Sequence, residues 1–125
     1  MRQFEVWVEN KVGMLAEVAE ILAKNRINIR GVATEAKNDK GIIKLVTDDE
    51  DATRKALTDA GMNFKEFEIV PTRLRDQPGE LAKVSRALAN LGVDIQSVFL
   101  LGKDHGTTEI AFKVSDLKKA REILD

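Results

Sequence analysis

The chain of 125 residues contains no cysteine and a single histidine, and its formal net charge is only -1. The absence of cysteine excludes disulfides, thiolate nucleophiles and cysteine-ligated metals, and it fits a cytoplasmic protein. The near-neutral charge provides no basic field to attract nucleic acid. The first residues, MRQFEVWVENK, contain no long apolar run, so we expect neither a signal peptide nor a membrane-spanning helix.

The motifs of common catalytic classes are also missing. The sequence has no phosphate-binding P-loop and no GxGxxG fingerprint. The single histidine, His105, lies in a turn-forming stretch, and one histidine without cysteine makes neither a metal site nor a Ser–His–Asp set. The acidic run Asp48–Asp51 is more simply the start of a helix than a Mg²⁺ site. We therefore expect no metal, no cofactor and no enzymatic activity.

An internal repeat is the strongest positive signal in the sequence. Residues 13–32 read GMLAEVAEILAKNRINIRGV, and residues 79–98 read GELAKVSRALANLGVDIQSV, without a gap in the alignment. Glycine, leucine, alanine, valine and isoleucine recur in register. Because the repeat contains both helical and strand patterns, it predicts a duplicated small domain rather than a solenoid. We expect one domain at residues 1–69 and the other at residues 70–125.

The hydrophobic pattern predicts the order of elements in each repeat. Alternation in residues 3–9 predicts a strand with Phe4, Val6 and Val8 on its buried face, and helical spacing follows Gly13. Two extended runs joined by a turn, a second helix and a further extended run come next. The second repeat has the same order up to its second helix, which ends the chain. Asn10 and Ser115 are expected to cap helices.

The expected order is thus βαββαβ followed by βαββα, without the closing strand. Helices separated by strand pairs predict an α+β protein of two ferredoxin-like units, each with an antiparallel sheet and both helices on one face. Trp7, with Glu5 and Glu9, would lie on the opposite face, where a large aromatic is unusual in solvent. We therefore expect that face to be covered by another sheet, most simply in a two-fold homodimer.

The two strand-to-helix loops, Asn10–Leu15 and Asp76–Leu81, are the candidate ligand sites. Each leads into a helix, where free N–H groups and the positive end of the helix dipole favour a carboxylate. Gly13 and Gly79 would let a ligand approach closely, but a glycine needed only for a tight turn is the simpler explanation. Duplication copies structural and functional features alike, so both explanations stay open.

These loops resemble those of a known family. The pattern Asp/Asn-x-x-Gly-x-Leu, a helix, and then Val/Ile-Asn/Asp-Ile is similar to that of ACT domains. The second repeat carries it as DQPGEL followed by VDI. The first repeat carries it as NKVGML followed by INI, with Val12 where the family usually has proline. The resemblance covers almost the whole chain.

The resemblance implies regulation by a small molecule, usually an amino acid, as in many enzymes of amino-acid biosynthesis. In ACT domains the first loop of one unit faces the start of the second strand of its partner, and the ligand lies between the units. On this sequence the implied ligand-binding positions are Asn10, Lys11, Val12, Gly13, Met14, Leu15, Asn28, Ile29, Asp76, Gln77, Pro78, Gly79, Glu80, Leu81, Asp94 and Ile95. Asp94 replaces the asparagine of serine-binding members, so we expect the two sites to differ in ligand or one to be empty.

We therefore expect a non-enzymatic regulatory protein that binds an amino acid at the interfaces between ACT units. It would form a homodimer and act in trans on an enzyme of amino-acid metabolism, without a nucleic-acid or membrane partner. The alternative is a ligand-free interaction module of the same fold, in which the loops serve packing and the sheet edges serve dimerisation.

Overall fold

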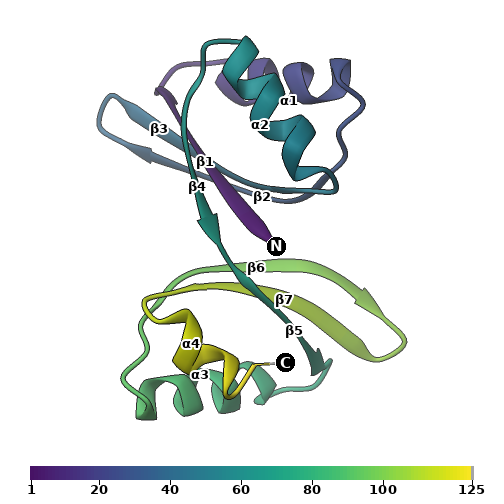
Figure 1. Cartoon of the computed structure of the whole chain (residues 1–125), viewed down its shortest axis with the longest axis vertical. Helices are drawn as coiled ribbons and strands as arrows, with labels where there is room; N and C mark the ends of the chain where they lie inside the picture. Colours follow the sequence, from purple (N-terminus) through teal and green to yellow (C-terminus); the bar gives the residue numbers. More distant parts are fainter. Residues whose placement is uncertain (125) are drawn as a thin grey trace. The chain divides into compact units, whose positions relative to one another are not determined.

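The computed structural model of the chain describes residues 1–124, which form two compact units (Figure 1). We call Arg2–Phe67 the first unit, and Met1 together with the residues from Glu68 onward the second unit. Each unit combines an antiparallel sheet with two helices, which confirms the predicted α+β class. No helix in residues 1–124 has the length and apolar character needed to span a bilayer.

The first unit follows the predicted βαββαβ order. Its sheet has the strand order β2-β3-β1-β4, and β3 runs antiparallel to both of its neighbours. Figure 1 shows both helices on the same face of this sheet. The elements are β1 (Arg2–Glu9), α1 (Met14–Lys24), β2 (Ile29–Lys37), β3 (Lys40–Thr47), α2 (Glu50–Asp59) and β4 (Asn63–Glu68).

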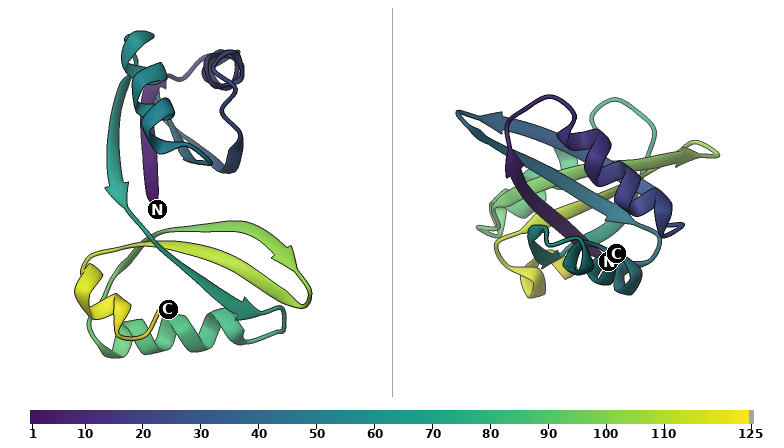
Figure 2. Two further views of the ribbon diagram at one scale, coloured as in Figure 1. Left: turned by 45° about the vertical axis from the view of Figure 1, so that its right-hand side comes forward. Right: turned by 90° about the horizontal axis from the view of Figure 1, so that it is seen from above.

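The second unit repeats this arrangement with one strand fewer. Its sheet has the order β5-β7-β6, and Figure 2 shows both of its helices on one side of the three strands. The elements are β5 (Val70–Arg75), α3 (Glu80–Asn90), β6 (Ile95–Asp104), β7 (Thr107–Val114) and α4 (Leu117–Arg121). Among the residues that the structure describes, this unit has no counterpart of β4, as the sequence predicted.

The duplication extends to irregularities of the backbone. The pairing of β2 with β3 shifts register between Ile29 and Gly31, and the pairing of β6 with β7 shifts between Ile95 and Ser97. These two register shifts occupy equivalent positions of the repeat, so the interruption of strand pairing is duplicated together with the sequence.

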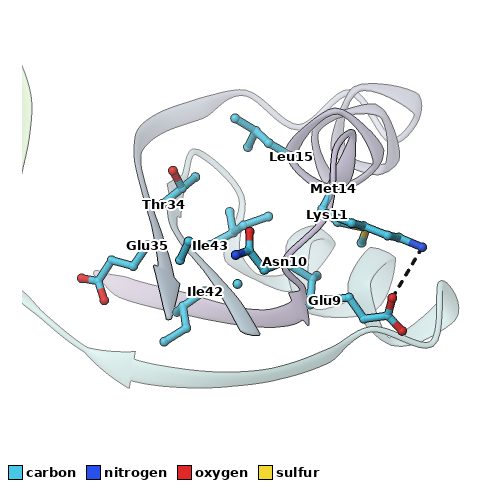
Figure 3. A pocket seen from close by; sticks show the side chains of 12 residues that line it. Glu9, Asn10, Lys11, Met14, Leu15, Thr34, Glu35, Ile42 and Ile43 are labelled. Carbon is cyan, nitrogen blue, oxygen red and sulfur yellow. Dashed lines mark ion pairs between the residues drawn. The ribbon is translucent and has the colours of Figure 1, made fainter. Parts of the chain in front are cut away.

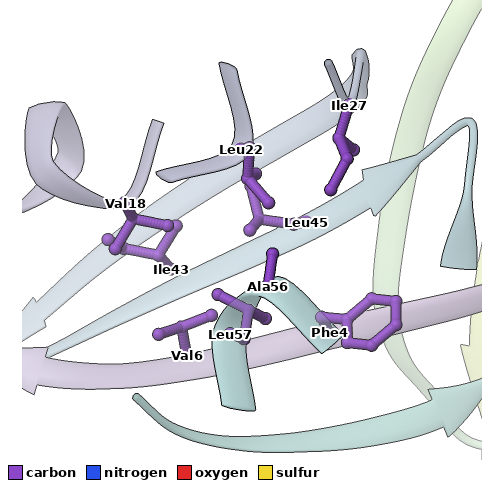
Figure 4. Packing of buried hydrophobic residues seen from close by; sticks show 9 residues of the cluster. All are labelled: Phe4, Val6, Val18, Leu22, Ile27, Ile43, Leu45, Ala56 and Leu57. Atoms are coloured by element: carbon purple, nitrogen blue, oxygen red, sulfur yellow. The ribbon is translucent and has the colours of Figure 1, made fainter. Parts of the chain in front are cut away.

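Each unit has its own hydrophobic core between its helices and its sheet. In the first unit, Val18 and Leu22 of α1 pack against Ile43 and Leu45 of β3 (Figure 4). Their equivalents on α3, Val84 and Leu88, belong to the core of the second unit. These four helix side chains therefore face inward as predicted, because the helical period places them on one side, whereas Leu15 and Leu81, which the same spacing places inward, are each 46% exposed.

The first predicted helix cap is wrong. The residue that precedes α1 is Gly13, which adopts a left-handed conformation and makes no side-chain cap. Asn10 lies three residues earlier, and its side-chain amide instead donates to the carbonyl oxygen of Asn38 at 2.9 Å. Asn10 therefore ties the end of β1 to the β2–β3 hairpin rather than closing the helix.

The second predicted cap is wrong by one residue. Asp116 precedes α4, and its carboxylate accepts from the backbone N–H of Lys119 at 3.0 Å. Ser115 has another role, since its hydroxyl oxygen accepts from the backbone N–H of Asp94 at 2.8 Å. The described helix ends at Arg121, and of the two apolar residues that follow, Ile123 is 36% exposed and Leu124 is buried.

The face of β1 away from the helices is buried over the first part of the strand and exposed at its end, where the Glu9 side chain is 80% exposed. Gln3 is fully buried, Glu5 is buried, and Trp7 is partly buried. The side-chain amide of Gln3 donates to the carboxylate of Glu5 at 2.7 Å, so these two buried polar groups satisfy each other in part. The homodimer expected from this face stays a prediction.

Candidate functional site

Each candidate loop contains a glycine in a left-handed conformation that other residues adopt only with strain. Gly13 has φ +92° and Gly79 has φ +90°, at equivalent points of the repeat. A Cβ atom added at either position would meet nothing within 4 Å. The backbone geometry alone therefore explains both glycines, and the space beside each of them is free.

A pocket of about 150 Å³ lies beside the first loop (Figure 3). It is bounded by the end of β1, the start of α1, and the parts of β2 and β3 near their hairpin. Leu15 lies on the helix side, Thr34 and Glu35 lie on the strand side, and Asn10 lies between them. The lining residues are Val8, Glu9, Asn10, Lys11, Met14, Leu15, Thr34, Glu35, Ala36, Gly41, Ile42 and Ile43.

The polar groups of this pocket lie at its rim. The Lys11 ammonium lies 3.7 Å from a carboxylate oxygen of Glu9, and both side chains are largely exposed. The amide nitrogen of Asn10 is held by the hairpin carbonyl, which fixes the side chain within the pocket lining. The pocket therefore has largely apolar walls, and the charged residues of its lining are Lys11, Glu9 and Glu35, the last of which pairs with Lys44.

A second pocket, of about 210 Å³, lies at the equivalent place in the second unit. The ammonium of Lys103, on β6, lies 3.2 Å from a carboxylate oxygen of Asp76. Both residues line the pocket, so an ion pair joins the loop to the strand across it. The lining residues are Leu74, Arg75, Asp76, Gln77, Glu80, Leu81, Leu100, Lys103, Thr108 and Ile110.

The structure brings together four of the six residues of each predicted loop. Asn10, Lys11, Met14 and Leu15 line the first pocket, and their equivalents Asp76, Gln77, Glu80 and Leu81 line the second. The intervening residues, Val12 and Gly13 in one loop and Pro78 and Gly79 in the other, do not belong to either lining and are exposed.

The predicted strand positions lie elsewhere in their units. The backbone N–H of Asn28 donates to the carboxylate of Asp48 at 3.0 Å, at the end of the sheet away from the β2–β3 hairpin. Asp94 makes the equivalent contact with Ser115. These two residues, with Ile29 and Ile95, line neither pocket. Within one unit, the loop and the strand start are therefore separate.

Several lining residues were missed by the sequence reasoning. Glu9 and Arg75 end the strands before the two loops, and Thr34 and Lys103 come from the far ends of β2 and β6. The hairpin register places Thr34 opposite Ile43, which carries it to the loop end of the sheet. Counting residue pairs from the predicted turn would have located these positions.

Two ferredoxin-like units in one chain, each with an open glycine loop before its first helix, define a tandem α+β domain. The family model described as an ACT domain pair matches residues 1–125, and the chain belongs to this family. No catalytic domain is evident in the described residues, 1–124. In that part of the chain, no three histidine or acidic side chains are grouped to hold a metal ion.

Known relatives connect the chain with aspartokinases. An aspartokinase from Corynebacterium glutamicum is 34% identical over 98 residues, which cover 74% of this chain but only 23% of that enzyme. Protein BT0572 from Bacteroides thetaiotaomicron is 30% identical, with a TM-score of 0.88 over 98% of this chain and 84% of that one. The ligand-free regulatory subunit of aspartate kinase from Thermus thermophilus, 15% identical, shares the fold with a TM-score of 0.74, over 98% of this chain and 87% of that subunit.

Proposed function

We propose that this protein is a non-enzymatic regulator that binds an amino acid beside its strand-to-helix loops and acts in trans on a cytoplasmic enzyme of amino-acid metabolism. The observation that carries the proposal is the first pocket, which combines the loop positions of an ACT domain pair with a small apolar space and two opposite charges at its rim. The aspartokinase relative supports amino-acid metabolism as the setting.

Two features of the loop suit the backbone groups of an amino acid. The first turn of α1 offers N–H groups without helical partners, together with the positive end of the helix dipole, and both favour a carboxylate. Carboxylate and amide oxygens such as those of Glu9 and Asn10 accept hydrogen bonds from an ammonium group. In a homodimer, a second ACT unit would present Asn28 or Asp94 to this loop and complete the site.

A ligand at this position regulates only if it binds two states of the protein with different affinities. An amino acid that bridges two ACT units stabilises their association and thereby changes the surface offered to a partner enzyme. The proposal thus requires that ligand binding and self-association be coupled.

A thermal-shift screen against the twenty amino acids tests the proposal. A ligand at 100 times its Kd adds about 2.7 kcal/mol to the stability, a shift of several degrees for a chain of this size. We expect a reproducible shift with one chemical group of amino acids. The double variant Asn10→Ala, Asn28→Ala is expected to lose the response, and an unchanged calorimetric affinity in that variant would reject the site.

A second candidate function, a ligand-free interaction module, is favoured by exposed apolar residues that recur in both units. Leu15 and Leu81 are each 46% exposed, and Val32 and Val98 are 48% and 46% exposed. Exposed apolar side chains at matched positions are typical of an association surface. A flat amino-acid panel combined with a dimer mass in light scattering, which Val32→Lys reduces to the monomer mass, would favour this alternative.

A further inference from the structure

The two pockets share a backbone but differ in chemistry. Of the four loop positions that line both, only the leucine is kept, since Asn10, Lys11 and Met14 are replaced by Asp76, Gln77 and Glu80. Duplication starts from identical copies, so these differences change what each pocket can hold.

The first pocket has the size and walls for an apolar side chain. The side chains of Val8, Met14, Leu15 and Ile43 line it, and no charged group comes from the start of its helix. Its volume is about 150 Å³. An engineered apolar cavity of about that volume in another protein binds benzene, so a side chain of four to six non-hydrogen atoms fits a space of this size.

The rim of the first pocket matches a zwitterion. Glu9 and Lys11 present opposite charges 3.7 Å apart, and their side chains are 80% and 62% exposed. Such an exposed ion pair contributes little to stability, so exchanging its partners costs little. Lys11 can turn to an α-carboxylate and Glu9 to an α-ammonium, while the side chain of the ligand enters the pocket between them.

The second pocket differs in its wall and in its rim. The carboxylate of Glu80, only 18% exposed, replaces the thioether of Met14 in the wall and lies 3.6 Å from the ammonium of Lys83. Its opposite charges are those of Asp76 and Lys103, whose ion pair at 3.2 Å crosses the pocket. An apolar side chain placed there would lie beside the carboxylate of Glu80 and against this ion pair, and removing water from these charges is unfavourable.

We infer that the first pocket selects an α-amino acid with an apolar side chain of four to six non-hydrogen atoms, and that the second pocket does not bind it. This inference rests on the proposed function, since it names the ligand class of the same site. It makes Met14 and the Glu9–Lys11 pair the determinants of specificity, and it predicts one such ligand per chain.

Exchange of one residue between the repeats tests the inference. The full chain and the variants Met14→Glu and Glu80→Met are titrated calorimetrically with leucine, isoleucine, methionine, aspartate and lysine. We expect the wild type to bind an apolar member with one site per chain, and Met14→Glu to weaken that binding at least about tenfold. Glu80→Met, the matched control, should leave the first site unchanged. Met14→Glu is expected to fold, because a carboxylate in the first helical turn is favoured by the dipole and α3 begins with one.

The outcomes separate the inference from the proposed function. Binding of only aspartate or lysine would overturn the inferred selectivity and leave the proposed function in place. The same conclusion follows if Met14→Glu leaves the binding of the apolar amino acid intact and Glu80→Met alters it. Two equivalent sites per chain would overturn the assignment to the first pocket. A response to none of the twenty amino acids would overturn both. The variant Lys11→Gln gives the first loop the residue that the second loop has at Gln77. Weaker binding of the apolar amino acid by this variant would support the role of the Glu9–Lys11 pair.

Discussion

Glu66 on β4 accepts hydrogen bonds from two arginines of the first unit. We expect its replacement to lower the stability of the folded chain in a way that depends on pH. The carboxylate accepts from Nε and Nη2 of Arg54 at 2.6 and 2.7 Å, and from Nε of Arg2 at 3.0 Å. Its side chain is only 17% exposed. The hydrogen bonds from Arg54, the largest cause, and those from Arg2 hold the pKa of Glu66 below its ordinary value, against the opposing effect of burial.

Glu66→Gln is expected to destabilise the folded chain by about 1 to 2 kcal/mol at pH 7. A hydrogen bond to a charged group contributes about 1.5 to 3 kcal/mol, and solvent at the partly exposed arginines reduces that amount. Glutamine keeps the shape and one acceptor oxygen, but it presents an amide group to a guanidinium. The loss therefore reports on charge rather than on packing.

The pH dependence follows from the direction of the shift. Because folding lowers the pKa of Glu66, the folded state binds this proton less tightly than the unfolded chain does. The contribution is complete above the pKa of the unfolded chain and is lost as the pH falls through the folded pKa, below about pH 5. The difference between wild type and Glu66→Gln should therefore narrow between pH 7 and pH 3.

Urea unfolding at several pH values, followed by the fluorescence of Trp7, measures this difference. Asp59→Asn is the matched control, because Asp59 pairs with Lys55 on the exposed surface of α2, where both side chains are more than half exposed. We expect the control to change the urea midpoint little at any pH. A Glu66→Gln difference that is absent at pH 7, or that grows toward pH 3, would refute the reasoning.

Three further predictions concern the first unit and are measured by urea unfolding at neutral pH. Leu22→Ala removes a fully buried core side chain and should cost about 3 kcal/mol; a cost below about 1 kcal/mol would contradict the described packing. Gly13→Ala should cost about 1 kcal/mol from the positive φ alone, since its Cβ would meet no atom within 4 Å, and an unchanged midpoint would contradict this conformation. Asp49→Ala removes the cap whose carboxylate accepts from the backbone N–H of Ala52 at 3.0 Å, and it should cost about 1 kcal/mol; an unchanged midpoint would contradict the cap.

The order of elements was predictable because it depends on patterns that extend over many residues. The spacing of Val18 and Leu22 on α1 and the alternation of Phe4 and Val6 on β1 both place side chains in the core described above. Each element of the first unit except β4 has a counterpart in the second repeat, so its pattern occurs twice in the sequence. The helix caps were harder to predict, because Asn10 and Gly13 are equally compatible with a helix start until the left-handed conformation of the glycine is known.

The candidate site shows why repetition predicts a scaffold better than a function. A left-handed glycine, a register shift and a buried helical stripe are constraints that each copy must satisfy in order to fold, so they recur in both units. A rim charge or the first residue of a helix is free to change once the backbone is fixed, and there Met14 has become Glu80 and Lys11 has become Gln77. The contact of Lys103 with Asp76 depends on the end of a paired strand, which no pattern within a single segment encodes. The parts of the site that differ between the repeats are therefore where its ligand specificity should be sought.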